Sequence, residues 1–204
     1  MKSYPSIPYG TVSDDIFYCF DKLDGSCIRA EWSKQKGFYK FGTRKHLITS
    51  EDGFLCEAPD LILTRYGDSL SKRFQEIECD RAVAFFEFVG PKSFAGMHFE
   101  EKHEVVLIDV SRDRIGFPTG QEFYNLYGDL GVPAMLHHGV VSEAVIESIR
   151  SSNLQGMTFE GVVFRGQVNK KKPMPVYFKQ KSRAWLDKLH TYCGENTQLF
   201  ETMK

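Results

Sequence analysis

A lysine stands two residues ahead of an Asp-Gly pair in the stretch DKLDGS, residues 21–26. The apolar run 16–20 precedes it and predicts a strand, so Lys22 is expected at a strand end. Lys22 is either a solvated turn residue or a nucleophile, because lysine amines can form covalent intermediates once they are deprotonated. Lys-x-Asp-Gly alone is too short to decide between these two interpretations.

Other charged residues interrupt apolar stretches that read as strands. Glu87 lies in FFEFVGP, Glu160 in FEGVVFRG, and Lys179 with Lys181 in VYFKQKS. An unpaired buried charge costs several kcal/mol, so these residues either pair with surface charges at a sheet edge or form a site. Residues two apart in a strand share a face, so Lys179 and Lys181 project together. If their strands meet the one that ends at Lys22, ammonium and carboxylate groups gather in one cleft, where a nucleoside triphosphate and a divalent metal would fit.

The elements that must position these residues are mainly strands in the first half of the chain. The three predicted strands up to residue 41 suggest an antiparallel meander, with the Asp-Gly turn between the first two. Thr119 and Glu122 form a capping box, and the apolar residues that follow at helical spacing predict a helix that Gly131 and Pro133 end. The fold class is therefore α+β, with antiparallel β-sheets flanked by helices on their outer faces. Predicted strands are 16–20, 27–32, 38–41, 82–89, 104–110, 158–165 and 176–181; helices are expected within 60–77, at 119–130 and 142–151, and around Trp185 and Leu189.

Composition limits the class of protein. A chain of 204 residues that is 42% hydrophobic and 26% charged is expected to form a single compact domain. No apolar stretch reaches membrane-spanning length and the N-terminal residues do not resemble a signal peptide, so a cytoplasmic protein is expected. The formal net charge of -1 gives no global attraction for a polyanion. Two local basic clusters stand out: Lys34, Lys36, Lys40, Arg44 and Lys45, and Lys170, Lys171, Lys172, Lys179, Lys181 and Arg183.

Five of these stretches, taken in order, resemble the motifs of the covalent nucleotidyltransferases, the superfamily of ATP-dependent DNA ligases, RNA ligases and mRNA capping enzymes. The resemblance covers residues 16–183, and any one motif is weak while five in order are strong. Within the superfamily, the segment FGTRKHLI around Arg44 is most similar to the phage-type RNA ligases. The matching stretches are KLDG at 22–25, the strand with Glu87, LIDV at 107–110, EGVV at 160–163 and KQKS at 179–182.

The resemblance implies the nucleotidyltransferase fold of a ligase adenylation domain. DNA ligases and capping enzymes continue after the last motif into an oligonucleotide-binding-fold domain. This sequence has 23 residues after Lys181, from 204 minus 181. Residues 1–204 are therefore expected to be a single adenylation domain without that second domain.

The resemblance also implies a role for each residue. Lys22 would attack the α-phosphate of ATP to form a lysyl-adenylate, and Lys179, Lys181 and bound metal are expected to lower the pKa of Lys22 by like-charge repulsion. Glu160 would bind Mg²⁺ or Mn²⁺ and Glu87 the ribose. Many relatives have an aromatic residue near Val106, and this departure leaves the adenine-stacking partner open. The further implied nucleotide-binding residues are Asp24 and Gly25 beside the nucleophile, Arg44 at a phosphate or the nucleic acid, Val106 and Val163 as apolar walls for adenine, and Lys179 and Lys181 at the α-phosphate.

The expected partner is RNA with a 5′-phosphate and a 3′-hydroxyl end, joined after AMP transfer, with DNA as an alternative substrate. An accessory nucleic-acid-binding protein is left open, since contacts elsewhere often position the strand. Three rival interpretations remain: a small DNA ligase, a capping-type guanylyltransferase that uses GTP, and a relative that binds nucleotide and nucleic acid without catalysis.

Overall fold

The computed structural model describes residues 2–91, 101–168 and 174–204. Lys170, Lys171 and Lys172 of the second basic cluster lie outside these residues. No helix in the described ranges is long and apolar enough to cross a membrane. In chain order the elements are β1 (Ser13–Lys22), β2 (Ser26–Ser33), β3 (Gly37–Gly42), η1 (Gly53–Glu57), α1 (Ala58–Glu76), β4 (Arg81–Val89), β5 (Glu104–Arg112), α2 (Gly120–Tyr127), η2 (Gly128–Leu130), β6 (Met135–Val141), α3 (Glu143–Arg150), β7 (Gly161–Val168), β8 (Pro175–Lys181), α4 (Arg183–Cys193) and α5 (Thr197–Met203).

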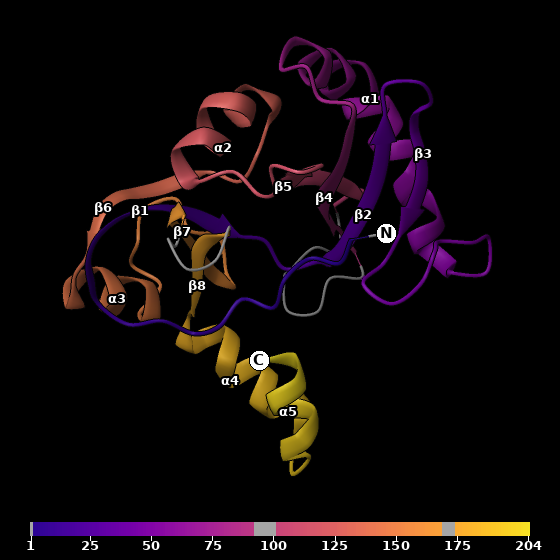
Figure 1. Ribbon diagram of the computed structural model, residues 1–204. Coiled ribbons are helices and arrows are strands. Elements are labelled where there is room, and N and C mark those ends of the chain that lie inside the picture. The colour runs from indigo at the N-terminus through magenta and orange to yellow at the C-terminus, as the bar shows by residue number, and fades with distance from the viewer. Residues whose placement is uncertain (1, 92–100, 169–173) are drawn as a thin grey trace.

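The strands form two antiparallel four-stranded sheets, which confirms the predicted α+β class. One sheet has the order β6-β1-β7-β8 and the other the order β3-β2-β4-β5. Figure 1 shows α1 along the second sheet, α3 beside the first, and α4 with α5 together at the C-terminal end. Both sheets therefore carry helices, and each keeps one face turned toward the other sheet.

The predicted meander of the first three strands is wrong. β2 pairs with β3, but β1 belongs to the other sheet and pairs with β6 and β7. The Asp24-Gly25 turn is thus a crossing between two sheets instead of a hairpin. Gly25 is required there because a Cβ would clash with the carbonyl oxygen of Phe88 on β4. The crossing leaves Lys22 at the end of one sheet and the start of the other sheet only four residues away, at Ser26.

Helix α1 covers its sheet with one apolar stripe. Its buried residues recur at every fourth position, which keeps them on one face of the helix. Burying each large apolar side chain of this kind contributes about 1.5–3 kcal/mol. The stripe consists of Ala58, Ile62, Tyr66, Leu70 and Phe74.

Local signals placed some elements well and others poorly. The capping box of Thr119 and Glu122 is present at the start of α2, as predicted. The strand predicted at 158–165 starts and ends three residues later than expected, because β7 runs from Gly161 to Val168, and Glu160 immediately precedes it. Strand β6 and helix α5 were not predicted as elements.

Asp109 on β5 joins the two sheets beneath their facing surfaces. Its carboxylate accepts hydrogen bonds from the hydroxyls of Tyr177 on β8 at 3.0 Å and Tyr4 at 3.2 Å. The same carboxylate forms an ion pair of 2.9 Å with Arg165 on β7. Asp109 is fully buried, and these partners supply the hydrogen bonds that a buried carboxylate needs. This cluster fixes the two sheets relative to each other.

Candidate active site

A cavity of about 500 Å³ lies between the facing surfaces of the two sheets, a size that suits a small organic ligand. Its polar end is at the Asp24-Gly25 crossing and its apolar end is formed by side chains of β1, β5, β7 and α2. Of the residues that the sequence singled out, it is lined by Lys22, Asp24, Gly25, Arg44, Glu87, Glu160, Val163, Lys179 and Lys181.

Sheet register explains why three lysines meet there. Lys22, Gly161 and Lys181 stand opposite one another across β1, β7 and β8. Lys179 is two residues along β8 from Lys181 and faces the same side of the sheet, as the sequence indicates. Gly161 fills the middle of this row because its φ is 142° and a Cβ would clash with the carbonyl oxygen of Gln180.

Glu160 bridges two of the lysines. Its Oε2 lies 2.9 Å from Lys22 Nζ and its Oε1 lies 2.8 Å from Lys181 Nζ. Glu160 is 4% exposed, and a carboxylate this deeply buried is stable only when it is paired. The two ion pairs therefore satisfy Glu160 and hold both ammonium groups at one end of the cavity.

The pKa of Lys22 differs from the sequence-based expectation. Burial is the largest single effect and lowers this pKa, but the nearby carboxylates of Glu160, Glu87 and Asp24 together outweigh it. The net pKa of Lys22 is raised above its ordinary value, so the expected depression by Lys179 and Lys181 is wrong for the protein without ligand. Glu160 in particular favours the charged form of the amine.

The lysines whose pKa is lowered are instead Lys179 and Lys181. The pKa of Lys181 is lowered to about 8, mainly by burial and in part by Lys22 and Lys179, while Glu160 opposes the change. Burial also lowers the pKa of Lys179, with the charge of Lys22 as the next cause. These three lysines crowd one another, which favours a polyanionic ligand that would neutralise them.

Glu87 faces the lysines from the opposite sheet. It sits on β4, where its ladder partners are Cys27 and Val106. Its pKa is raised to about 7, mainly by burial and in part by Glu160, while Lys22 and Arg44 oppose the change. Val106 shares the ladder position of Glu87 but is not among the residues that line the cavity, and Ile108 two residues further along β5 lines it.

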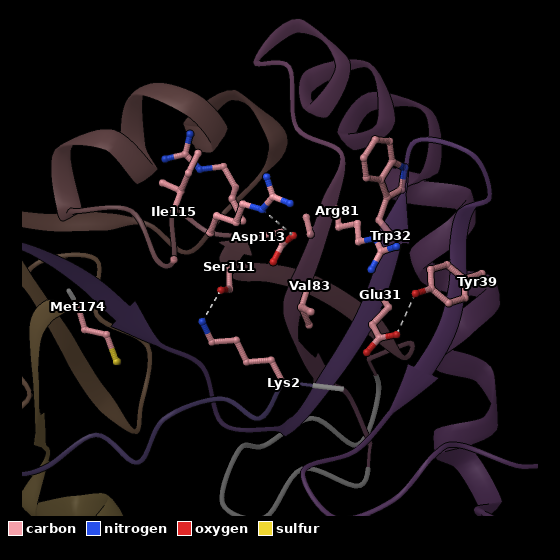
Figure 2. Close-up of a pocket in the computed structure, with 14 residues that line it drawn as sticks. Lys2, Glu31, Trp32, Tyr39, Arg81, Val83, Ser111, Asp113, Ile115 and Met174 are labelled. Carbon is pink, nitrogen blue, oxygen red and sulfur yellow. Dashed lines mark hydrogen bonds and ion pairs between the residues drawn. The ribbon is translucent and has the colours of Figure 1, made fainter. Parts of the chain in front are cut away.

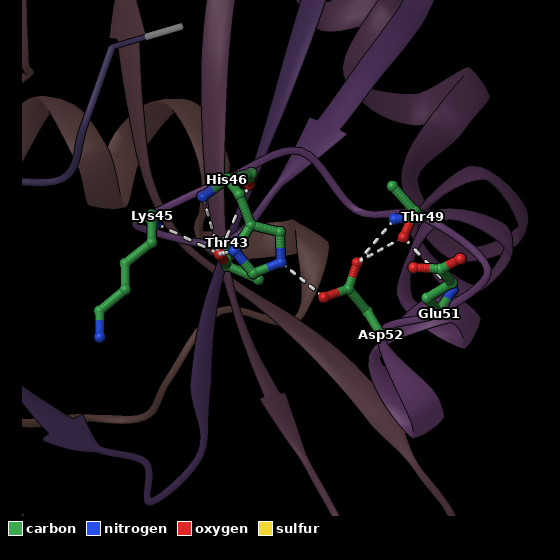
Figure 3. A network of polar contacts seen from close by, with 6 residues as sticks. All are labelled: Thr43, Lys45, His46, Thr49, Glu51 and Asp52. Carbon is green, nitrogen blue, oxygen red and sulfur yellow. Dashed lines mark hydrogen bonds and ion pairs between the residues drawn. The ribbon is translucent and has the colours of Figure 1, made fainter.

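Arg44 reaches the cavity from an exposed loop after β3, and a local network of hydrogen bonds holds this loop (Figure 3). The Asp52 carboxylate contacts His46 Nε2 at 2.5 Å and accepts the Thr49 amide at 2.7 Å. The Thr43 hydroxyl accepts the backbone amides of Lys45 and His46. The contacts on both sides of Arg44 therefore fix the backbone that carries it.

Helix α5 closes part of the polar end. A main-chain oxygen of Lys204, the residue after α5, accepts a hydrogen bond from Lys179 Nζ at 2.7 Å, and the carbonyl oxygen of Met203 accepts one from Lys181 Nζ at 3.4 Å. Phe200 on the same helix packs against the buried cluster Trp185, Leu189 and Cys193. Backbone oxygens thus occupy the lysine donors that a phosphate would use.

A divalent metal fits these carboxylates only in company with a phosphate. Both oxygens of Glu160 already accept from lysines, and Glu87 and Asp24 line the same cavity. In the ranges that the structure describes, no three His, Cys, Asp or Glu side chains are grouped to hold a metal by themselves. Mg²⁺ commonly uses one or two protein carboxylates and completes its shell with substrate phosphates and water. The donor set therefore suits a metal that binds together with the ligand.

Several residues that line this cavity were not singled out from the sequence, among them Arg165 and Ile108. Arg165 was detectable by the criterion that found Glu87, since it is a charge at the end of the apolar run GVVF. Arg29 on β2 does not line the cavity, and its Nη1 donates to the Ser3 hydroxyl at 3.1 Å.

A second hollow, of about 580 Å³, opens at the far end of the β3-β2-β4-β5 sheet (Figure 2). Lys2 donates to the Ser111 hydroxyl at 2.7 Å there, and the Tyr39 hydroxyl donates to Glu31 at 3.1 Å. None of the residues singled out from the sequence as site candidates lines it. Of these two cavities, only the first is lined by the lysine and glutamate candidates.

Comparison with known proteins finds likeness in structure only. No protein-family profile and no curated protein matches the sequence. An archaeal ATP-dependent RNA ligase superposes with a TM-score of 0.65 and 17% identity, over 95% of this chain and 52% of that one. An RNA ligase of Naegleria gruberi, solved with ATP and Mn, gives 0.61 and 18% over 86% and 52%. A candidate ATP-dependent DNA ligase from Aquifex aeolicus gives 0.63 and 20% over 97% and 55%.

These likenesses confirm the predicted fold: the chain has the architecture of the nucleotidyltransferase domain of RNA and DNA ligases. The chain spans about half the length of the solved structures that it matches, from 52% to 55% of each.

Proposed function

We propose that this chain is the nucleotide-transferring part of an ATP-dependent RNA ligase, with Lys22 as the nucleophile. The observation that carries the proposal is the bridge from Glu160 to Lys22 and Lys181 inside a cavity between two sheets of ligase-type fold. A structural salt bridge would need one lysine, whereas this cavity gathers three, together with Arg44. Several ammonium and guanidinium groups that converge on one cavity suit the binding of a triphosphate.

In the first step the Lys22 Nζ attacks the α-phosphorus of ATP. A phosphorus–nitrogen bond forms, the bond to the bridging oxygen breaks, and pyrophosphate leaves with that electron pair. The amine must give up a proton before or during attack, because an ammonium group has no lone pair to donate. Glu160 at 2.9 Å is the base within reach of that proton.

The other residues bind and orient the nucleotide. Lys179 and Lys181 would replace their contacts to the α5 carbonyls with contacts to the α-phosphate and stabilise its developing charge. Arg44 would bind a phosphate from its loop, Glu87 the ribose, and Val163 with Ile108 the faces of the base. Mg²⁺ or Mn²⁺, held by Glu160 and the phosphates, would neutralise charge on the departing pyrophosphate.

Two later steps would complete the joining of RNA ends. An oxygen of the 5′-phosphate attacks the lysyl-bound AMP and releases Lys22, which leaves the end activated as an adenylate. The 3′-hydroxyl oxygen then attacks the 5′-phosphorus and expels AMP. The chain spans about half the length of its structural neighbours. The two later steps and the RNA partner are therefore proposed for the whole ligase, of which this chain supplies the nucleotide-transferring part.

A DNA ligase is the second candidate, since the Aquifex aeolicus neighbour is described in those terms. A nicked DNA duplex and a nicked RNA duplex, each with a labelled 5′-phosphate at the nick, distinguish an RNA ligase from a DNA ligase. Faster sealing of the RNA nick supports the first proposal, and faster sealing of the DNA nick favours the second.

The experiment that tests the first step is covalent labelling. The protein is mixed with Mg²⁺ and α-labelled ATP or GTP, then denatured, alongside Lys22→Ala and a control, Lys40→Ala, at a partly buried lysine on β3 that does not line the cavity. We expect label from ATP in the wild type and the control and none in Lys22→Ala. Label from GTP alone would indicate a capping-type enzyme, and absence of label from both nucleotides on folded protein would refute the proposal.

A further inference from the structure

The ammonium group of Lys181 lies over the face of the Trp185 indole, with Nζ 3.3 Å from a ring centroid. Both residues are 3% exposed and both line the cavity, so water screens this contact little. A cation over an aromatic face is attracted by the ring, most strongly by tryptophan and where water is excluded. Lys179 has a weaker contact of this kind, with Nζ 4.9 Å from the ring centroid of Tyr9, which is 38% exposed. The indole is therefore a substantial partner of Lys181.

Helix α4 fixes the position of Trp185 beside the ion pair of Glu160 and Lys181. The amide of Trp185 donates to the hydroxyl of Ser182, the N-cap of α4, at 3.1 Å. The same hydroxyl donates to the carbonyl oxygen of Phe159 at 2.7 Å, and the Ser182 amide donates to the carbonyl oxygen of Glu160 at 3.0 Å. Backbone hydrogen bonds thus join the start of the helix to the strand ends that carry the ion pair.

Two other contacts of the Lys181 ammonium group have a further task in the proposed reaction. Glu160 Oε1 lies 2.8 Å from Lys181 Nζ, but Glu160 also contacts Lys22, whose proton it would receive. The carbonyl oxygen of Met203, at 3.4 Å, is a contact that the α-phosphate would displace. The indole face of Trp185 neither takes up a proton nor competes with the phosphate. It is therefore the partner that can stay with the ammonium group during the reaction.

We propose that Trp185 is a positioning residue, which holds the ammonium group of Lys181 at the α-phosphate while its contacts to Glu160 and Met203 weaken. This inference rests on the proposed function, because it takes Lys181 to stabilise the charge that develops on the α-phosphate. Such stabilisation is most effective when the charged group is already in place before the reaction. A lysine side chain has much rotamer freedom to lose, and the contact with the ring reduces that freedom in advance.

Fluorinated tryptophan separates the attraction of the ring from its shape. Fluorine withdraws electron density from the indole face and weakens its attraction for a cation, while the ring changes little in size. The whole chain, whose two tryptophans are Trp32 and Trp185, is produced with tryptophan, 5-fluorotryptophan or 5,6,7-trifluorotryptophan. Covalent labelling by α-labelled ATP and Mg²⁺ is then measured in a single turnover. We expect the maximal rate to fall with each substitution, by about threefold to tenfold for the trifluoro protein, with the KM for ATP unchanged within about twofold.

Three variants complete the series. Trp185→Leu removes the aromatic face and should lower the maximal rate about tenfold to thirtyfold, while Trp185→Phe keeps a weaker face and should recover part of that loss. Trp185→Phe also carries fluorine only at Trp32, so its rate should not depend on fluorination. Leu189→Ala, at a residue of the same buried cluster that does not line the cavity, is the control for packing. We expect Leu189→Ala to lower the urea midpoint and to leave the maximal rate unchanged.

A measurement without turnover tests whether the contact persists when nucleotide is bound. The Cε protons of Lys181, next to Nζ, should resonate upfield of an ordinary lysine in NMR spectra, because the ring current of Trp185 shields them. The probe is the ATP analogue with CH₂ between the α and β phosphorus atoms, together with Mg²⁺. We expect the upfield shift to remain at saturation with the analogue. A return of these protons to the ordinary lysine position would overturn the inference.

The outcomes separate this inference from the proposed function. Equal maximal rates for the trifluoro and unfluorinated proteins overturn the inference, and so does an equal effect of fluorine in Trp185→Phe. If Lys22 becomes labelled in either case, the proposed function stands and only the role of Trp185 falls. If the unsubstituted protein neither binds the analogue nor becomes labelled by ATP, both are refuted.

Discussion

Asp21 accepts two hydrogen bonds from Thr158, one from its amide at 3.0 Å and one from its hydroxyl at 2.9 Å. The pair is separated by 137 positions in sequence, and it joins the residue before Lys22 to a residue two positions before Glu160. Asp21 is 5% exposed, so water competes little for these bonds. The link therefore sets the distance between the proposed nucleophile and its carboxylate partner.

We expect Thr158→Val to slow labelling of Lys22 at saturating ATP with little change in the KM for ATP. The variant keeps the amide donor and loses the hydroxyl, which should destabilise the fold by about 1 kcal/mol and loosen the position of Lys22. Urea unfolding and single-turnover labelling measure the two effects. Thr191→Val, at an exposed helical threonine, is the control. A labelling rate equal to that of the control would show that the link has no positioning role.

The Glu160 ion pairs should stabilise the fold as a unit. Glu160→Gln leaves Lys181, which is 3% exposed, without its carboxylate and should cost about 3–5 kcal/mol. Adding Lys181→Met to Glu160→Gln should recover part of that loss, because the unpaired ammonium group is removed. Urea unfolding of both single variants and the double variant measures the coupling. Additive losses would mean that the two residues stabilise the protein independently.

Glu87 should make stability depend on pH. Its pKa is raised to about 7 in the folded protein by burial above all, and an unfolded glutamate has its ordinary, lower pKa. The folded state therefore binds more protons between about pH 4.5 and 7, and stability falls as pH rises through that window. The groups that face Glu87, namely Lys22, Arg44, Glu160 and Asp24, are included in this shift.

Replacing Glu87 with glutamine should remove that dependence. We expect Glu87→Gln to be more stable than the wild type at pH 8, by up to about 3 kcal/mol, with the difference shrinking toward pH 4.5. Urea midpoints across this range, without nucleotide, provide the measurement. Parallel pH profiles for the two proteins would contradict the proposed burial cost.

The hydrogen bonds of Asp52 that hold the Arg44 loop should strengthen the binding of ATP. Asp52→Ala deletes the carboxylate that receives His46 and Thr49, and we expect it to raise the KM for ATP about twofold to tenfold with little change in the maximal labelling rate. Arg44→Ala sets the upper limit of the effect. Glu51→Ala, at an exposed neighbour in the same loop, is the control. An unchanged KM in Asp52→Ala, together with a raised KM in Arg44→Ala, would show that ATP binding does not need the hydrogen bonds of Asp52.

Helix α5 should compete with ATP for the lysines. Phe200→Asp should detach the helix from its apolar cluster and lower the KM for ATP about twofold to tenfold, since Lys179 and Lys181 lose the carbonyl contacts that ATP must displace. Leu199→Asp, at the exposed neighbour on the same helix, is the control. A raised KM in Phe200→Asp would instead mean that α5 helps to hold the nucleotide.

The sequence by itself determined the local chemistry and the local elements. The capping box of Thr119 and Glu122 specified the start of α2, because its two hydrogen bonds form between residues three apart. Alternation placed Lys179 and Lys181 on one face of β8. The order of the charged stretches was sufficient to indicate the fold that the structural neighbours share.

Only the tertiary structure decided which strands are neighbours, because pairing between distant segments leaves no local periodicity. The Asp24-Gly25 turn looked like a hairpin, yet its strands belong to different sheets, and this crossing creates the cavity. The pKa of Lys22 also depended on tertiary distance, since the carboxylates of Glu160, at 2.9 Å, Glu87 and Asp24 together outweigh the lowering by burial.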